Sequence, residues 1–310
     1  LRCPAPTAEV RHDAGVLTVA PADDRRRPAA VRAGADGSWH SADPRWLPVH
    51  LLDSLPRPVL LDDLDPFRTV DSGLEQHGLG ATGTLTGPEH AGWDAVWDGV
   101  YAMLRVAGEG RVAETRQLLH CLVPLARPPG GGPDSTAIAH CSGTRREAFG
   151  AVLSSTPGTS SSLAATLVHE LQHAKLAALT DLLPLHHADG RARYWAPWRP
   201  DPRPFDGLLQ GAYAHLALAG YWQRYALWSS DPADRDNAWA EHSRCRAQVG
   251  AALPALRGSR SLTAAGRTLV EGMAGQHVRL LERPPPKGHL ARAAAYVETA
   301  RTMWRRQQTR

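Results

Sequence analysis

The sequence predicts an α+β fold that is mainly α-helical, and three features of the 310 residues indicate it. Short apolar pieces separated by Pro, Asp and Gly fill residues 1–70, as expected for strands. Apolar residues at helical spacing follow from about residue 89. Four long helical patterns then occupy the chain from residue 207 onward. The length suits one large domain or two small ones.

In chain order, the first elements are extended segments, in GVLTVAP, AAVRAG and PVLLDDLDPF. The patterns WDAVWDGVYAMLRVAG and VAETRQLLHCLVPLA, between Glu89 and about Leu125, predict a pair of helices. A Pro- and Gly-rich stretch at 127–135 predicts a flexible break. We therefore expect an N-terminal lobe at 1–126 and a second region at 127–310, with one continuous domain as the alternative.

The second region starts with two predicted short strands, in TAIAHCSGT and EAFGAVLSST. A helix should follow from Leu163 to Thr180, because this stretch lacks Gly and Pro and comes after three candidate N-cap serines, Ser160, Ser161 and Ser162. A proline-rich loop, RARYWAPWRPDPRPF, separates it from four further helices. Those helices are predicted near 207–228, 234–256, 262–282 and 288–308.

Composition narrows the class of protein. The net charge of +4 is small and the arginines are spread along the chain, so nucleic-acid binding is not indicated. No apolar run approaches the ~20 residues that span a bilayer, and the start of the chain lacks the apolar core of a signal peptide. The four cysteines show no C-x-x-C spacing, which favours reduced thiols. We expect a cytoplasmic enzyme, and a trimmed chain because Leu1 replaces an initial Met.

The segment LVHELQHAKL at 167–176 contains the residues that indicate a metal site. On a helix, His169 and His173 lie one turn apart on the same face, and Glu170 lies beside that face. This H-E-x-x-H spacing is typical of a metal site in which the glutamate contacts a water on the metal. A small sheet, the histidine helix and a helical C-terminal half together indicate a zincin-like layout.

A third metal ligand is needed, because two histidines rarely hold a catalytic ion alone. The extended motif with a third histidine six residues later is absent, since Leu179 stands at that position. His215, in the helical stretch GLLQGAYAHLALAGYW, is our choice because its neighbours are small or apolar. Glu241, or His186 or His187, are the alternatives.

Beyond the motif, four blocks resemble the HExxH-motif proteins encoded beside ribosomally synthesised, post-translationally modified peptides. They are LVHELQHAKLAALTDLLPL, YWAPWRPDPRPFDGLLQGAYAHLALAGYW, LDDLDPFRTV and CSGTRREAFGAV. The resemblance implies an Fe(II)- and 2-oxoglutarate-dependent hydroxylase that acts on the β-carbon of a side chain in a precursor peptide. Glu170 would then orient groups near the metal and would not activate water. Three histidines would depart from the usual iron site of two histidines and a carboxylate.

A 2-oxoglutarate co-substrate needs a cationic anchor for its distal carboxylate. The proline-rich loop supplies Arg199 and Arg203 just before the helix of His215. Lys175 is a further candidate, because it and Lys287 are the only lysines in an arginine-rich chain. The aromatic residues of the same loop are candidates for a peptide groove; they are Tyr194, Trp195, Trp198 and Phe205. The alternatives are a zinc metallopeptidase that cleaves a precursor or leader peptide, and a non-enzymatic scaffold that binds the peptide.

Overall fold

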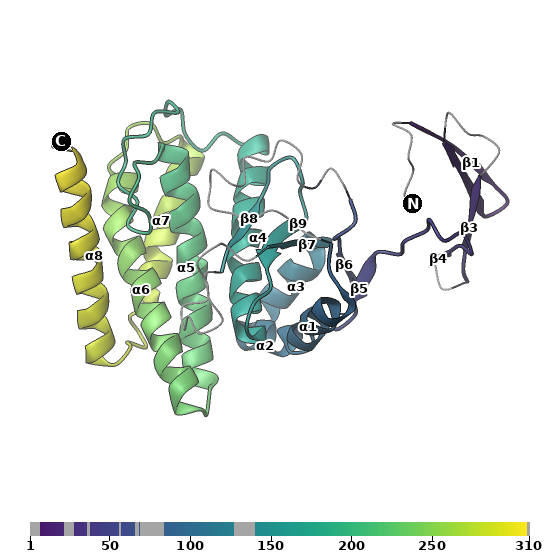
Figure 1. Ribbon diagram of the computed structural model, residues 1–310. Coiled ribbons are helices and arrows are strands. Elements are labelled where there is room, and N and C mark those ends of the chain that lie inside the picture. Colours follow the sequence, from purple (N-terminus) through teal and green to yellow (C-terminus); the bar gives the residue numbers. More distant parts are fainter. Residues whose placement is uncertain are drawn as a thin grey trace.

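The computed structural model describes residues 7–21, 28–35, 38–55, 57–65, 68, 84–126 and 140–308. The fold is α+β and mainly helical, which confirms the predicted class. Two small sheets precede a helical C-terminal half, and Figure 1 shows the chain running from the sheets to α8. The predicted break at 127–135 lies outside the described residues.

The first sheet is an antiparallel meander in the order β1-β2-β3-β4. Its strands are β1 (Ala8–Asp13), β2 (Val16–Pro21), β3 (Ala29–Ala33) and β4 (Trp39–His40). The turn between β1 and β2 places Ala14 and Gly15 at φ of 44° and 78°. Two successive positive φ values match the right-handed twist of a tight hairpin. Figure 1 draws this sheet apart from the helices, at the N-terminal end of the chain.

The second sheet has the order β5-β6-β7-β9-β8. Its strands are β5 (His50–Leu52), β6 (Val59–Leu61), β7 (Cys121–Leu125), β8 (Ser142–Thr144) and β9 (Ala151–Ser155). The central strands β6, β7 and β9 are parallel, and the strands at the two edges pair antiparallel. Because β7 lies before residue 127 and β9 after it, the sheet is continuous across the predicted boundary.

One predicted helix is wrong at its end. The pattern expected to remain helical to Leu125 forms α3 (Glu109–Leu118) and then strand β7. Pro124 lacks the N–H that a helix interior needs. Four of the five β7 residues are buried, as in a parallel strand covered on both faces.

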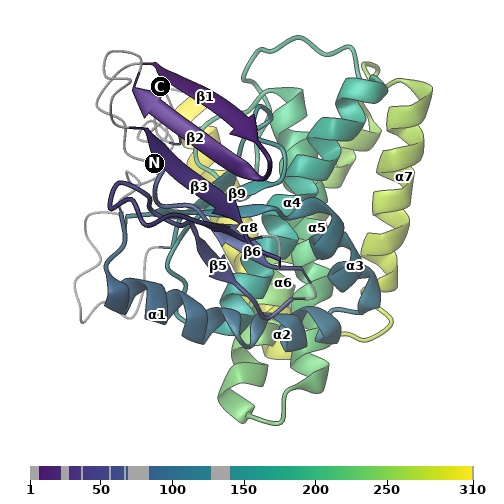
Figure 2. The same cartoon turned by 90° about the vertical axis from the view of Figure 1, so that its right-hand side faces the viewer.

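Helices α1 (Gly87–Trp97), α2 (Val100–Val106), α3 and α4 (Ser160–Leu182) lie beside the second sheet (Figure 2), and α4 packs against β8 and β9. Helix α4 is the predicted histidine helix. Its N-cap is Thr159, one residue before the expected serines, because Thr159 has an extended backbone and its Oγ1 accepts a hydrogen bond from Ser162 N at 3.2 Å.

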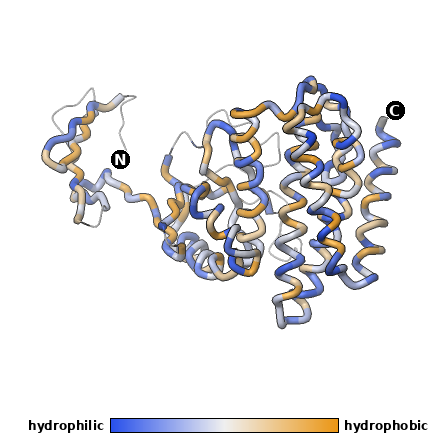
Figure 3. The backbone as a smooth tube through the Cα atoms, turned by 180° about the vertical axis from the view of Figure 1, so that it is seen from behind, coloured by the Kyte–Doolittle hydropathy of each residue, from blue (hydrophilic) through white to orange (hydrophobic). Residues whose placement is uncertain are grey.

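The four predicted C-terminal helices are confirmed as α5 (Phe205–Trp228), α6 (Pro232–Arg257), α7 (Ala264–Arg279) and α8 (Lys287–Gln308). Hydrophobic and hydrophilic stretches alternate along these helices in Figure 3, as expected for amphipathic elements. None of the helices in the described ranges has both the length and the apolar character of a membrane span.

Two apolar cores share α4 and α5. The first includes Trp93, Trp97 and Leu163, and lies between the second sheet, α1 to α4 and the C-terminal half of α5. The second includes Phe205, Leu208 and Val249, and lies among α5, α6 and α7. The histidines of the motif therefore lie on a helix that connects the two cores.

Candidate metal centre

Helix α4 brings the two motif histidines into direct contact. His169 Nε2 and His173 Nε2 are 3.1 Å apart, and their rings meet edge to face. Two nitrogens bound to one ion at about 2.0–2.1 Å would lie roughly 3.0–3.4 Å apart. The observed separation of the pair therefore fits a shared metal ion.

His215, from α5, lies beside this pair, with its ring centroid 5.3 Å from that of His169. Its Nδ1 donates to the carbonyl of Gly211 at 2.8 Å, and Gln210 Oε1 lies 3.3 Å from His173 Nδ1. An N–H on Nδ1 leaves a lone pair on Nε2, which is the form that binds a metal. Two of the three rings are thus oriented by partners on α5.

The three imidazole rings lie next to one another, but they do not form a complete metal-binding group. Over the described part of the chain, no group of three His, Cys, Asp or Glu side chains is already arranged to hold a metal ion. The ring contacts show that His169 and His173 are paired and that His215 is adjacent to them. The donor set consists of imidazoles, which suit Zn(II) and Fe(II).

Burial favours the neutral form of His215 and His169. It lowers the pKa of His215 to about 4, although the Gly211 carbonyl opposes the shift. Burial also lowers the pKa of His169 well below its usual value, with a further contribution from His173 and His215. A metal ligand must be unprotonated, so these two shifts favour the form of His169 and His215 that binds a metal.

Glu170 points toward the sheet and is 3% exposed. Its Oε1 accepts from the Ser142 hydroxyl at 2.7 Å, and its Oε2 from Thr144 at 3.4 Å. Burial raises the pKa of the Glu170 carboxyl, while His173 and the two hydroxyls oppose this. The glutamate therefore joins α4 to the edge strand β8.

A cavity of about 1380 Å³ opens over the histidines. The motif residues His169, Glu170 and His173 line it, together with His215. The predicted anchors Arg199 and Arg203 line it as well. Both guanidinium groups contact Asp201, at 3.0 Å from Arg199 Nε and 3.4 Å from Arg203 Nη1.

Lys175 is placed differently from the prediction. It is not among the described residues that line the cavity. Its ammonium pairs with Glu114 of α3 and lies 5.5 Å from the centre of the Tyr213 ring. Since Lys175 follows His173 by two residues, it points about 200° around the helix from that histidine.

The alternative third ligands do not join the pair. Glu241 pairs with Arg244 one turn along α6 and is outside the described cavity lining. His187 is exposed, and its backbone N–H donates to Ser261. His186 lines the cavity, but its Nε2 lies 3.4 Å from Asp206 Oδ1 and its ring meets Phe205.

Three further residues contribute to the site without having been predicted from the sequence. Gln210 contacts His173, while Ser142 and Thr144 bind Glu170. Only their positions in the blocks around the motif could have indicated them. Among the loop aromatics, Trp198 lines the cavity, whereas Phe205 is fully buried in the second core.

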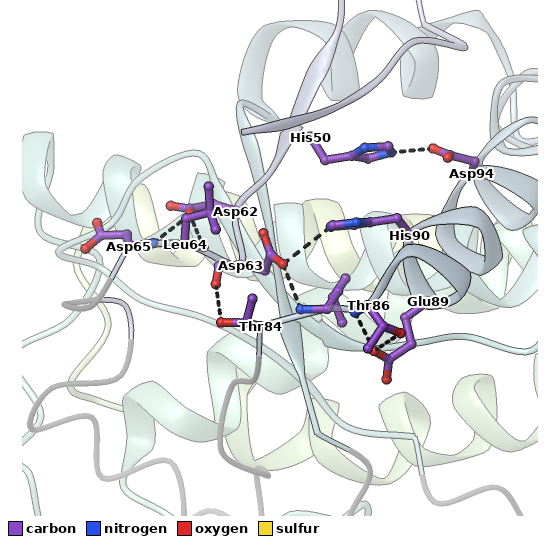
Figure 4. Close-up of polar contacts among 11 residues, drawn as sticks. His50, Asp62, Asp63, Leu64, Asp65, Thr84, Thr86, Glu89, His90 and Asp94 are labelled. Atoms are coloured by element: carbon purple, nitrogen blue, oxygen red, sulfur yellow. Dashed lines mark hydrogen bonds and ion pairs between the residues drawn. The ribbon is translucent and has the colours of Figure 1, made fainter. Parts of the chain in front are cut away.

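The described part of the upstream block, residues 61–65, contributes to a separate polar cluster, shown in Figure 4. Asp63 is 2% exposed, accepts from the N–H of Leu85 at 2.7 Å and lies 3.4 Å from His90 Nε2. The His90 ring stacks on that of His50, with centroids 4.6 Å apart. His50 pairs with Asp94 at 2.8 Å. These contacts connect β5 and the end of β6 to α1, away from the cavity.

No protein-family model matches the sequence, and a search of curated proteins found no match.

Proposed function

We propose that this chain is an Fe(II)- and 2-oxoglutarate-dependent hydroxylase that oxidises the β-carbon of a side chain in a ribosomally synthesised precursor peptide. The observation that carries the proposal is the composition of one cavity. Its lining combines the paired histidines and His215 with the guanidinium groups of Arg199 and Arg203. The resemblance of four sequence blocks to the HExxH-motif peptide-modification proteins supports the same reaction.

When bound, Fe(II) would supply O₂ activation: one oxygen atom enters a C–H bond of the peptide, and the other enters 2-oxoglutarate, which becomes succinate and CO₂. His169, His173 and His215 would hold the ion. Three protein ligands leave coordination positions for a bidentate co-substrate and O₂. The Gly211 carbonyl and Gln210 fix the orientation of His215 and His173.

The two arginines suit the distal carboxylate of the co-substrate. Arg203 lies against the first turn of α5, where its Nε is 3.2 Å from the position that a Cβ on Gly207 would occupy. The N-terminal end of a helix favours a negative charge. A guanidinium has five N–H donors, so contact with Asp201 leaves donors for a second carboxylate.

A peptide substrate is supported by the position of β8. This strand is an edge of the second sheet, and Ser142, Gly143 and Thr144 all line the cavity. An extended peptide can pair with the exposed backbone of an edge strand. Such pairing would carry side chains of the peptide past Glu170 and the histidines.

The contacts of Glu170 favour a hydroxylase over a zinc peptidase. A peptidase needs this carboxylate to take a proton from a metal-bound water. Here each carboxylate oxygen accepts a hydrogen bond from a hydroxyl group of β8. An orienting role in a reaction without an activated water agrees better with that arrangement.

The proposal includes a cytoplasmic location. Cys121, Cys141 and Cys245 are free thiols, as is usual in a reducing compartment.

The test supplies Fe(II), 2-oxoglutarate and O₂ to the purified chain with the precursor peptide encoded beside its gene. Succinate and the mass of the peptide are measured. We expect succinate and a gain of one oxygen. Arg203→Ala should raise KM for 2-oxoglutarate by roughly tenfold or more, because an ionic anchor is lost. Arg193→Ala is the matched control, since Arg193 is in the same loop but pairs with Asp189.

The other outcomes decide between the alternatives. Peptide cleavage without succinate would replace the proposal with the zinc peptidase. An unchanged peptide that nevertheless binds would indicate the scaffold.

A further inference from the structure

Trp198 lies flat against the third histidine. The centroids of its ring system and the His215 ring are 4.6 Å apart, and the two planes differ by 21°. The planes of His215 and His169, in contrast, are nearly perpendicular, at 81°. His215 is therefore in contact with both an aromatic platform and the motif pair.

Gly211 makes this stacking geometrically feasible. A Cβ at this position would lie 2.2 Å from Trp198 Cζ2 and 2.8 Å from its Nε1, closer than atoms can approach. The same residue provides the carbonyl that accepts from His215 Nδ1. One turn of α5 thus makes room for the indole and holds one atom of the imidazole.

The segment that carries Trp198 is itself anchored. Ala196 is fully buried, and the carbonyl of Pro197 accepts from Gln248 Nε2 of α6 at 3.4 Å. The N–H of Arg199 donates to the Ala196 carbonyl at 3.0 Å, which closes a turn around Trp198. The backbone that carries the indole is therefore held in place against the second core.

We infer that Trp198 is a positioning residue that fixes the plane of the His215 ring so that its Nε2 faces the metal centre. The inference depends on the proposed metal site. A hydrogen bond to Nδ1 holds one atom of an imidazole but still permits rocking about that contact. A stacked ring removes this freedom, because rotation would drive the imidazole edge into the indole face. The two contacts together keep His215 in one orientation.

The test is titration of the metal-free full-length chain with Co(II), following the visible absorption that reports the number and geometry of ligands. Trp198→Ala should weaken Co(II) binding by about tenfold and shift the spectrum toward that of His215→Ala. Trp198→Phe keeps a flat ring and should retain the wild-type spectrum. Gly211→Ala should behave like Trp198→Ala, because the added methyl group displaces the indole.

Gly220→Ala is the matched control. It is the same change on the same helix, but a Cβ there meets no atom within 4 Å. Its Co(II) affinity and spectrum should equal those of the wild type. Circular dichroism and thermal unfolding of every variant separate loss of the ring contact from loss of the fold.

Two results would overturn the inference. One leaves the proposed metal site intact, and the other also removes His215 from the ligands. If His215→Ala loses Co(II) while Trp198→Ala binds like the wild type, Trp198 does not position the ligand but the proposed site stands. If His215→Ala also binds like the wild type, His215 is not a ligand and the inference fails with that assignment.

Discussion

Replacing Glu170 by Gln tests the role of the motif glutamate while keeping its shape. Both contacts of the carboxylate are hydroxyl groups, those of Ser142 and Thr144. A hydroxyl can donate or accept, so a Gln amide can keep both contacts. We expect the free energy of unfolding to change by less than about 1 kcal/mol. Glu170→Ala leaves both hydroxyls without a partner and should cost about 1–3 kcal/mol.

The two proposed mechanisms predict different kinetics for Glu170→Gln. In a hydroxylase the residue joins α4 to β8, so turnover should stay within roughly tenfold of the wild type. In a peptidase it is the general base, whose loss costs about 10²–10⁴ in rate. The gap between these expectations is wide enough for one assay to separate them.

The assay compares the wild type, Glu170→Gln and Glu170→Ala. Succinate and peptide mass report turnover, metal analysis reports occupancy of the site, and urea unfolding reports stability. A fall in turnover of more than about 100-fold in Glu170→Gln, with full metal and unchanged stability, would refute the orienting role.

The remaining predictions concern the ligands and the lysine. His169→Ala and His173→Ala should each lose bound metal and activity, whereas Glu241→Ala should keep both; metal analysis with circular dichroism decides. Lys175→Met should destabilise the fold by about 1 kcal/mol at pH 7, a figure reduced for the partial exposure of the lysine. Burial raises the pKa of Glu114, but Lys175 and Arg111 outweigh this effect, so the pKa of the carboxyl is lowered from its usual 4.5. This stabilisation exists above pH 4.5 and is lost as the pH falls through the lowered folded-state pKa, so urea unfolding measured from pH 7 downward should show the difference shrinking only below pH 4.5. A raised KM for 2-oxoglutarate with unchanged stability would instead restore Lys175 as a co-substrate anchor.

Much of the site could be predicted from the sequence because helical periodicity fixes relative directions. The four-residue spacing of His169 and His173 places them on one face, and they are in contact. The small or apolar neighbours of His215 made it our choice of third ligand, and its ring lies beside that of His169. Lys175 shows the limit of reasoning from composition, because its rarity suggested a role that its direction on the helix does not favour.

Other features depend on contacts between segments far apart in the chain, which the local sequence pattern does not contain. The end of the second predicted helix is strand β7, since partners on β6 and β9 override an apolar run that also suits a helix. The contact of Gln210 with His173 depends on the rotation of α5 against α4. Trp198 was one of several loop aromatics, and only the path of the loop distinguishes it from Phe205, which fills the second core.

The division of the interior into two cores has a consequence for how the protein unfolds. Leu163, Leu167 and Leu171 anchor the first part of α4 in the core beneath the sheet, while Phe205 and Leu208 anchor the start of α5 in the other. Both helices contribute to both cores, and an ion held by histidines of α4 and α5 would cross-link the two helices between the cores. Removing it should lower the midpoint of the unfolding transition, since an ion that binds only the folded chain stabilises it.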